Sequence, residues 1–162
     1  MVADPRPGDS PLTPGEPMKL TSSTFAEGQE IPEKCGKRAQ NVSPHLTWSD
    51  EPAGTRSFAL TVVDWHPVAR GYVHWMVCDI RPTTTTFMEG AAARGLPEGT
   101  RQVRAYAGPF PPSGTHDYVF TLHALDIAAP NIPPGATLDE FNAAVSSHTL
   151  ATATLTGHFT RR

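Results

Sequence analysis

The chain has 162 residues, which is enough for one domain with a single buried core. Its formal net charge of −3 offers no electrostatic attraction to nucleic acid or to an anionic membrane. No apolar run reaches the roughly 18 residues of a membrane span, and no basic segment precedes an apolar one, so we expect neither membrane insertion nor a secretory signal. The two cysteines, Cys35 and Cys78, are too few for a disulfide framework and predict reduced thiols in a cytoplasmic protein.

The first 17 residues contain five prolines, scattered charges and almost no apolar side chains. This composition cannot offset the entropy lost on ordering, so it predicts a disordered tail at 1–17 followed by a domain at 18–162. In the first half of the domain, alternating or apolar runs between turn residues predict strands. These strands are expected at residues 18–22, 46–48, 57–63 and 74–80.

The second half begins with a connection at 81–99, rich in threonine and glycine, which predicts an irregular excursion over the surface. Further strands are expected at 102–106, 119–125 and, near the end of the chain, 151–159. The middle one is apolar on both faces, as expected of a central strand. Thr137 and Glu140 form the capping-box pattern of a helix start. Many short strands with one late helix predict a mostly β fold, a β-sandwich with Greek-key connections.

A proline-rich loop at 108–118 reads Gly-Pro-Phe-Pro-Pro-Ser-Gly-Thr-His-Asp-Tyr. Its prolines restrict the backbone and remove donors, while its two glycines permit a positive φ or a close backbone approach. The loop is therefore stiff, and it presents His116 and Tyr118 on one face of an extended backbone. This arrangement suits a binding site better than a hinge.

A second polar stretch, Asp-Trp-His-Pro-Val-Ala-Arg-Gly-Tyr-Val-His-Trp, spans residues 64–75. Asp64 stands at the end of one expected strand, His74 begins the next, and His66 lies in the loop between them. Together the two stretches bring one carboxylate, up to three imidazoles and a phenol to strand ends. The sequence therefore predicts a candidate site at one end of a sheet.

These stretches resemble the phosphatidylethanolamine-binding protein family, in the compact bacterial and archaeal branch often called Raf kinase inhibitor-like. Further matching segments are Asn-Val-Ser-Pro-His-Leu-Thr-Trp at 41–48, Pro-Ala-Gly-Thr-Arg-Ser at 52–57 and Leu-Ala-Thr-Ala-Thr-Leu-Thr-Gly at 150–157. The resemblance covers roughly residues 18–160 and implies the family's β-sandwich. It also implies an anion pocket that maps onto Asp64, His74, Gly108, Pro109, His116 and Tyr118.

The chemistry of these residues agrees with an anionic ligand, since imidazole, tyrosine O–H and the Gly108 N–H can all donate hydrogen bonds. Asp64 would repel an anion, so its expected role is to accept a hydrogen bond from a histidine and favour that ring's charged form. We expect binding to weaken as the pH rises through the histidine titration, near neutrality or somewhat above. Aromatic and proline side chains are expected as walls that lower the local dielectric, namely Trp65, Trp75, Phe110, Pro111 and Pro112.

The chain departs from the family pattern at two places. Trp65 and His66 stand where the family usually has proline and aspartate, so the site loses a negative charge and gains an imidazole. His66 is therefore included among the expected ligand-binding residues, and the pocket is expected to prefer anions more strongly. At the rim, Asp117 stands where the family commonly has arginine, so a negative charge replaces a positive one. This change opposes the one at residue 66, and the ligand is left unassigned.

The sequence thus favours a soluble, non-enzymatic binding protein with a pocket for a small phosphate-bearing anion and with no cofactor or resident metal. The family's other reputation, regulation of a protein partner as a kinase or protease inhibitor, is the main alternative. A hydrolase or metal-binding protein is the third, although the spacing lacks a nucleophile; its residues are Asp64, His66, His74 and His116. A homodimer that pairs through residues 81–99 is also expected.

Overall fold

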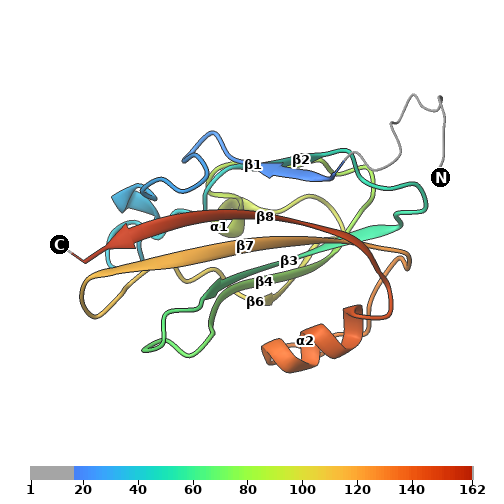
Figure 1. Ribbon diagram of the computed structural model, residues 1–162. Coiled ribbons are helices and arrows are strands. Elements are labelled where there is room, and N and C mark those ends of the chain that lie inside the picture. The colour runs from blue at the N-terminus through green and yellow to red at the C-terminus, as the bar shows by residue number, and fades with distance from the viewer. Residues whose placement is uncertain (1–16, 162) are drawn as a thin grey trace, which may run out of the picture.

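The computed structural model describes residues 17–161, so the predicted tail at 1–17 lies outside the described residues apart from residue 17. The chain forms two antiparallel sheets stacked in layers, with a helix against the free face of the larger sheet (Figure 1). The larger sheet has the order β6-β4-β3-β7-β8 and consists of β3 (Ser57–Asp64), β4 (Tyr72–Ile80), β6 (Arg101–Arg104), β7 (Thr115–Leu125) and β8 (Thr149–Thr160). The smaller sheet has the order β1-β2-β5 and consists of β1 (Lys19–Thr21), β2 (Leu46–Ser49) and β5 (Thr86–Phe87).

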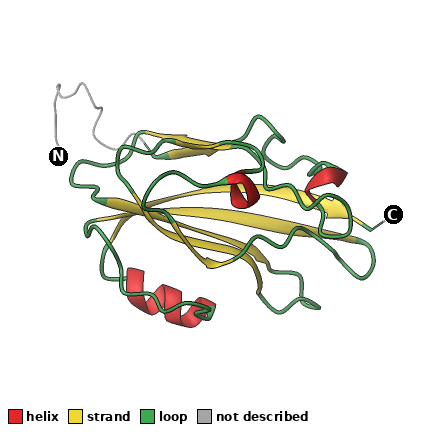
Figure 2. Ribbon diagram, turned by 180° about the vertical axis from the view of Figure 1, so that it is seen from behind, coloured by secondary structure: helices red, strands yellow, loops and turns green. Residues whose placement is uncertain are grey.

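The helical segments are short, as Figure 2 shows; they are η1 (Glu33–Cys35), α1 (Ala91–Arg94) and α2 (Leu138–Val145). At the start of α2 the capping box is formed in both directions. The Glu140 N–H donates to Thr137 Oγ1 at 3.1 Å, and the Thr137 N–H donates to Glu140 Oε1 at 2.8 Å. The helix buries Phe141 and Val145 against the larger sheet. Among residues 17–161, no helix is long and apolar enough to cross a membrane.

The larger sheet has an apolar core on each of its faces. One cluster lies between the two sheets and includes Trp48, Phe58 and Phe87, while the other lies beneath α2 and includes Met76 and Phe141. All residues of β3 are buried because this strand lies in the middle of the sheet with both faces covered. The predicted mostly β sandwich, with one late helix and a C-terminal strand, is confirmed. The strand expected to be central, now β7, is an interior strand beside β3.

The connection at 81–99 is more regular than the sequence pattern indicates. It contributes β5 and α1, and Phe87 on β5 is fully buried against Trp48. The expectation of an irregular surface excursion is therefore wrong for this segment. A two-residue strand has no periodicity to detect, so only its pairing with β2 reveals it.

Both cysteines are buried and unpaired, and they belong to different apolar clusters. Burial raises the pKa of the Cys35 thiol to about 11 and that of the Cys78 thiol to about 12. Both thiols therefore stay protonated at neutral pH and act as small apolar core groups.

Candidate functional site

Three neighbouring strands of the larger sheet end together and carry the polar residues of the candidate site. Asp64 is the last residue of β3, and it pairs in register with Tyr72 on β4 and with Tyr118 on β7. His74 and His116 lie two residues from these tyrosines on the same strands, and alternation directs them to the same face. The pairing of β3 with both neighbours is thus what brings distant segments of the chain together.

A cavity of about 230 Å³ opens at this end of the sheet. The strands supply its polar floor, the proline-rich loop supplies one wall, and the loop between β3 and β4 supplies the other. The lining residues are Asp64, Val68, Ala69, Tyr72, His74, Phe110, Pro111, Pro112, His116 and Tyr118.

Asp64 and His116 form a buried pair at the floor of the cavity, with only 3% and 2% of their surfaces exposed. His116 Nδ1–H donates to Asp64 Oδ2 at 2.6 Å, and the His66 N–H donates to the other carboxylate oxygen at 2.9 Å. Both carboxylate oxygens are therefore engaged by the chain itself. Nε2 of His116 makes no hydrogen bond among residues 17–161, so this atom is the one available to a ligand.

His74 lies across the cavity from this pair and is held by the backbone. Its Nδ1–H donates to the Ala107 carbonyl at 2.6 Å, which fixes the ring and leaves Nε2 without a hydrogen bond among the described residues. Burial lowers the pKa of His74 below its ordinary value, although the Ala107 carbonyl and the Asp64 carboxylate oppose the shift. At neutral pH the ring is therefore neutral, and its Nε2 is an acceptor.

Tyr118 lies between the two histidines. Its ring centroid is 5.0 Å from that of His74 and 6.5 Å from that of His116. The side chain is 1% exposed, and its hydroxyl has no hydrogen-bond partner within residues 17–161. Burial, helped by the nearby Asp64 carboxylate, raises the pKa of the phenol. The cavity thus contains a buried O–H donor with its hydrogen bond unmade, which is costly unless a ligand or water accepts it.

His66 does not line the cavity, but it lies directly over His116. The two imidazole rings are stacked, with centroids 3.9 Å apart and planes inclined by 4°. His66 Nδ1 accepts the Val68 N–H at 3.1 Å, so the loop holds the ring in place. The ring therefore covers the outer face of His116.

Gly108 and Pro109, both expected in the pocket, lie outside it. The Gly108 N–H donates to Asn41 Oδ1 at 2.7 Å and cannot also serve an anion. A side chain at Gly108 would overlap the Cys35 carbonyl, and the Pro109 carbonyl accepts the Lys37 N–H at 3.1 Å. Glycine is needed here because the proline-rich loop packs tightly against residues 35–41. In the structure these two residues hold the loop against residues 35–41.

The two tryptophans expected as walls also lie elsewhere. Trp75 is fully buried on the opposite face of β4 from His74, where its indole N–H donates to Gln102 Oε1 at 2.7 Å. Adjacent strand residues point to opposite faces, so His74 and Trp75 could not both line one cavity. Trp65 is 58% exposed and lies over Gly71. The remaining expected walls, Phe110, Pro111 and Pro112, do line the cavity.

Sequence reasoning assigned no role to Val68, Ala69 and Tyr72, which form the wall between β3 and β4. Val68 is 62% exposed and Tyr72 47%, so both are large apolar groups left at the mouth of the cavity. An apolar residue inside a polar loop is the signal that could have identified them. Asn41, which supports the proline-rich loop, stood in a matching segment but carried no predicted role.

The arrangement of the cavity residues also bears on the metal and hydrolase alternatives. Within the described part of the chain, no group of three or more histidine, cysteine or acidic side chains is arranged to hold a metal ion. His66 stacks on His116 instead of converging with His74 on a common point. No serine, threonine or cysteine is among the described residues that line the cavity, and its side-chain hydroxyls belong to Tyr72 and Tyr118.

The fold and site together define a β-sandwich protein with a small cavity at the ends of its central strands, whose floor carries the polar groups. The family model described as phosphatidylethanolamine-binding protein matches residues 21–160. The chain belongs to the phosphatidylethanolamine-binding protein family, which confirms the resemblance inferred from its motifs.

Relatives of known sequence and structure support the compact bacterial and archaeal branch. The UPF0098 protein YbhB of Escherichia coli K12 is 36% identical over 157 residues, covering 88% of this chain and 99% of that protein. The solved structure of Escherichia coli YbcL, titled a new member of the mammalian PEBP family, is 28% identical with a TM-score of 0.82, covering 90% of this chain and 99% of that one. The Chlamydia trachomatis PEBP homolog CT736 gives 30% identity and a TM-score of 0.80, with the same coverage.

One relative bears on location. The Mycobacterium tuberculosis H37Rv protein LppC, which is named as a lipoprotein, is 39% identical over 156 residues, covering 93% of this chain and 76% of that protein. A cytoplasmic location for the present chain therefore stays a prediction.

Proposed function

We propose that this protein is a non-enzymatic binding protein that takes up a small phosphate-bearing ligand in the cavity at Asp64, His74, His116 and Tyr118. The observation that carries the proposal is the buried Asp64–His116 pair beside the unpartnered Tyr118 hydroxyl. A phosphate offers several strong acceptor oxygens, which match the Tyr118 hydroxyl and, in their protonated forms, Nε2 of His116 and of His74.

His116 is the principal donor in this proposal. Asp64 accepts the hydrogen bond from Nδ1 and orients the ring. In its charged form the ring donates from both nitrogens, to Asp64 and to a ligand oxygen. His66 stacks on the outer face of the His116 ring and shields it from water. The lower local dielectric strengthens the hydrogen bond from His116 to the ligand.

The mouth of the cavity favours a phosphate joined to a less polar body over inorganic phosphate alone. Val68 and Tyr72 are exposed there, opposite the half-buried ring of Phe110, whose centroid is 5.8 Å from that of Tyr72. These surfaces gain free energy when an apolar group covers them. A headgroup phosphate with an attached organic group satisfies both parts of the site.

Calorimetric titration of phosphorylethanolamine and of inorganic phosphate tests the proposal. His116→Ala is expected to weaken phosphorylethanolamine binding about ten-fold or more, since a hydrogen bond to a charged group contributes roughly 1.5–3 kcal/mol. Tyr118→Phe is expected to weaken binding while leaving the fold intact, because it removes only the unpartnered hydroxyl. The matched control is His148→Ala, which removes an exposed imidazole paired with Asp126 at 2.9 Å, away from the cavity. Unchanged affinity in both His116→Ala and Tyr118→Phe would contradict the proposal.

The pH dependence gives a further readout of the same experiment. His74 can donate to a phosphate oxygen from Nε2 only when its ring is protonated, because Nδ1–H is already committed to Ala107. Burial places its pKa below the ordinary 6.5, so affinity is expected to be higher at acidic pH and to fall as the pH rises through that lowered value. For His74 we therefore expect the transition below the range near or somewhat above neutrality that the sequence suggested.

A further inference from the structure

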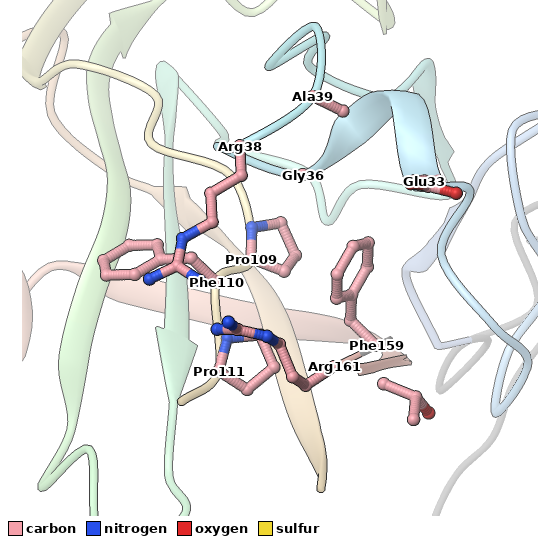
Figure 3. Close-up of a pocket in the computed structure, with 10 residues that line it drawn as sticks. Glu33, Gly36, Arg38, Ala39, Pro109, Phe110, Pro111, Phe159 and Arg161 are labelled. Atoms are coloured by element: carbon pink, nitrogen blue, oxygen red, sulfur yellow. The ribbon is translucent and has the colours of Figure 1, made fainter. Parts of the chain in front are cut away.

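A second cavity lies on the other side of the proline-rich loop. It has a volume of about 240 Å³, far above the 10–15 Å³ or so that one water requires (Figure 3). It shares Phe110 and Pro111 with the first cavity, but none of the histidines, Asp64 or Tyr118 lines it. It is therefore a separate space with its own chemistry.

Two arginines from distant parts of the chain define this second cavity. Arg38 follows η1 and Arg161 follows β8, and Figure 3 shows both guanidinium groups reaching toward Phe110 and Pro111. Neither guanidinium makes an ion pair or a hydrogen bond among residues 17–161. Two neighbouring cations repel each other, and an anion held between them would relieve that repulsion.

The charges around the cavity favour an anion. Lys37 adds a third positive charge, with Nζ 5.1 Å from the centre of the Phe110 ring. Glu33 is the acidic lining residue, and in Figure 3 it lies at the other end of the cavity from both guanidinium groups. A guanidinium presents a planar fork of donors that matches a carboxylate or phosphate group bidentately.

Apart from Thr160, the remaining side chains of the lining are apolar, and most of them are flat rings. Pro109, Pro111 and the rings of Phe110 and Phe159 surround the space next to the guanidinium groups (Figure 3). Proline rings and phenyl rings are surfaces on which a flat apolar group packs well. A ligand with an anionic end and a ring would therefore use both parts of the cavity.

We propose that this second cavity binds a small aromatic oxyanion, a ring that carries a carboxylate or a phosphate. Arg38 and Arg161 hold the anionic group, and the ring packs against Phe110, Phe159 and the prolines. The two arginines that hold the anionic group do not line the first cavity, although Phe110 and Pro111 line both. Binding at the arginines can therefore be tested separately from the phosphate site proposed above.

NMR titration of the isotope-labelled protein with benzoate, phenyl phosphate and neutral benzyl alcohol tests this assignment. Both anions are expected to shift the Nε–H signals of Arg38 and Arg161 saturably, and the stronger binder identifies which oxyanion the site prefers. Benzyl alcohol is expected to bind at least ten-fold more weakly. The double variant Arg38→Gln/Arg161→Gln is expected to lose at least ten-fold in affinity for the anions.

Two further variants make the result specific. Arg81→Gln/Arg94→Gln removes two exposed arginines that do not line the cavity and is expected to keep full affinity. His116→Ala alters only the first cavity, so the shifts of the Arg38 and Arg161 signals are expected to persist. The proposal is overturned if these signals do not move, if benzyl alcohol binds as well as the anions, or if the shifts vanish in His116→Ala.

Discussion

His116 and His123 lie on the same strand, β7, and meet opposite surroundings. His116 donates to a buried carboxylate, whereas His123 packs edge-on against the Phe141 ring of α2, with centroids 5.4 Å apart. Nδ1 of His123 is buried and has no hydrogen-bond partner within residues 17–161. Burial lowers the pKa of this ring to about 4, so it stays neutral where an exposed histidine would be charged. His116 is thus part of the candidate site, whereas His123 packs against the apolar core beneath α2.

The neutral His123 ring predicts sensitivity to acid. Between pH 6.5 and 4 the unfolded chain binds a proton that the folded ring refuses, so stability falls as the pH is lowered. From pH 7 to pH 5 this residue is expected to cost about 1–2 kcal/mol. Urea unfolding at both pH values is expected to show a smaller loss in His123→Leu than in the wild type.

The control for this measurement is Phe141→Leu, which loosens the same contact without removing a titratable group. It is expected to lower stability at both pH values and to keep the wild-type pH dependence. An equal pH dependence in His123→Leu and wild type would mean that His123 titrates normally in the folded protein.

At the scale of elements, the proline-rich loop owes its position to the segment 35–41 beneath it. Asn41 lies in the left-handed region at φ 56° and makes two hydrogen bonds at the start of the loop, accepting from the Gly108 N–H and donating to the Tyr106 carbonyl. The Tyr106 hydroxyl donates to the Cys35 carbonyl at 2.9 Å. These bonds hold one wall between the two cavities, so both cavities depend on the same short segment.

The helix α2 gives a simpler test of a local element. Thr137→Ala removes the side-chain half of the capping box and is expected to lower the free energy of unfolding by about 1 kcal/mol. The control is Thr83→Ala, since Thr83 is exposed and its side chain makes no hydrogen bond among the described residues. Its effect is expected to stay within about 0.5 kcal/mol in denaturant unfolding. Equal effects of the two substitutions would show that the cap does not stabilise the helix.

At the scale of the whole molecule, three layers share two apolar cores. The small sheet covers one face of the large sheet and α2 covers the other (Figure 1). The first layer begins at Met18, whose side chain is 6% exposed, and at Leu20, which is 4% exposed. These are the first buried side chains among residues 17–161, and the domain boundary at residue 18 stays a prediction.

This boundary predicts different outcomes for two truncations. Deleting residues 1–16 is expected to leave the melting temperature nearly unchanged, because the described core begins after them. Deleting residues 1–21 also removes β1 with Met18 and Leu20, and is expected to lower it by several degrees. Calorimetric melting of both proteins checks this, and a large loss in the first truncation would move the boundary toward the N-terminus.

The sequence alone was sufficient for the elements that depend on local pattern. Period-two alternation located the long strands, and the Thr137–Glu140 spacing located α2, because both signals act within a few residues. Motif spacing also pointed to Asp64, His74, His116 and Tyr118, which the strand pairing places around one cavity. The two-residue strand β5 carried no such signal.

Only the tertiary structure decided which donors remain available and which side chains meet. The Gly108 N–H is taken by Asn41, 67 residues earlier in the chain, and His66 is turned onto His116 by the path of its loop. Likewise, Arg38 and Arg161 come together only because β8 ends beside the segment after η1. A hydrogen bond is satisfied, and a cavity is lined, by groups that folding brings close, and no local pattern specifies those partners.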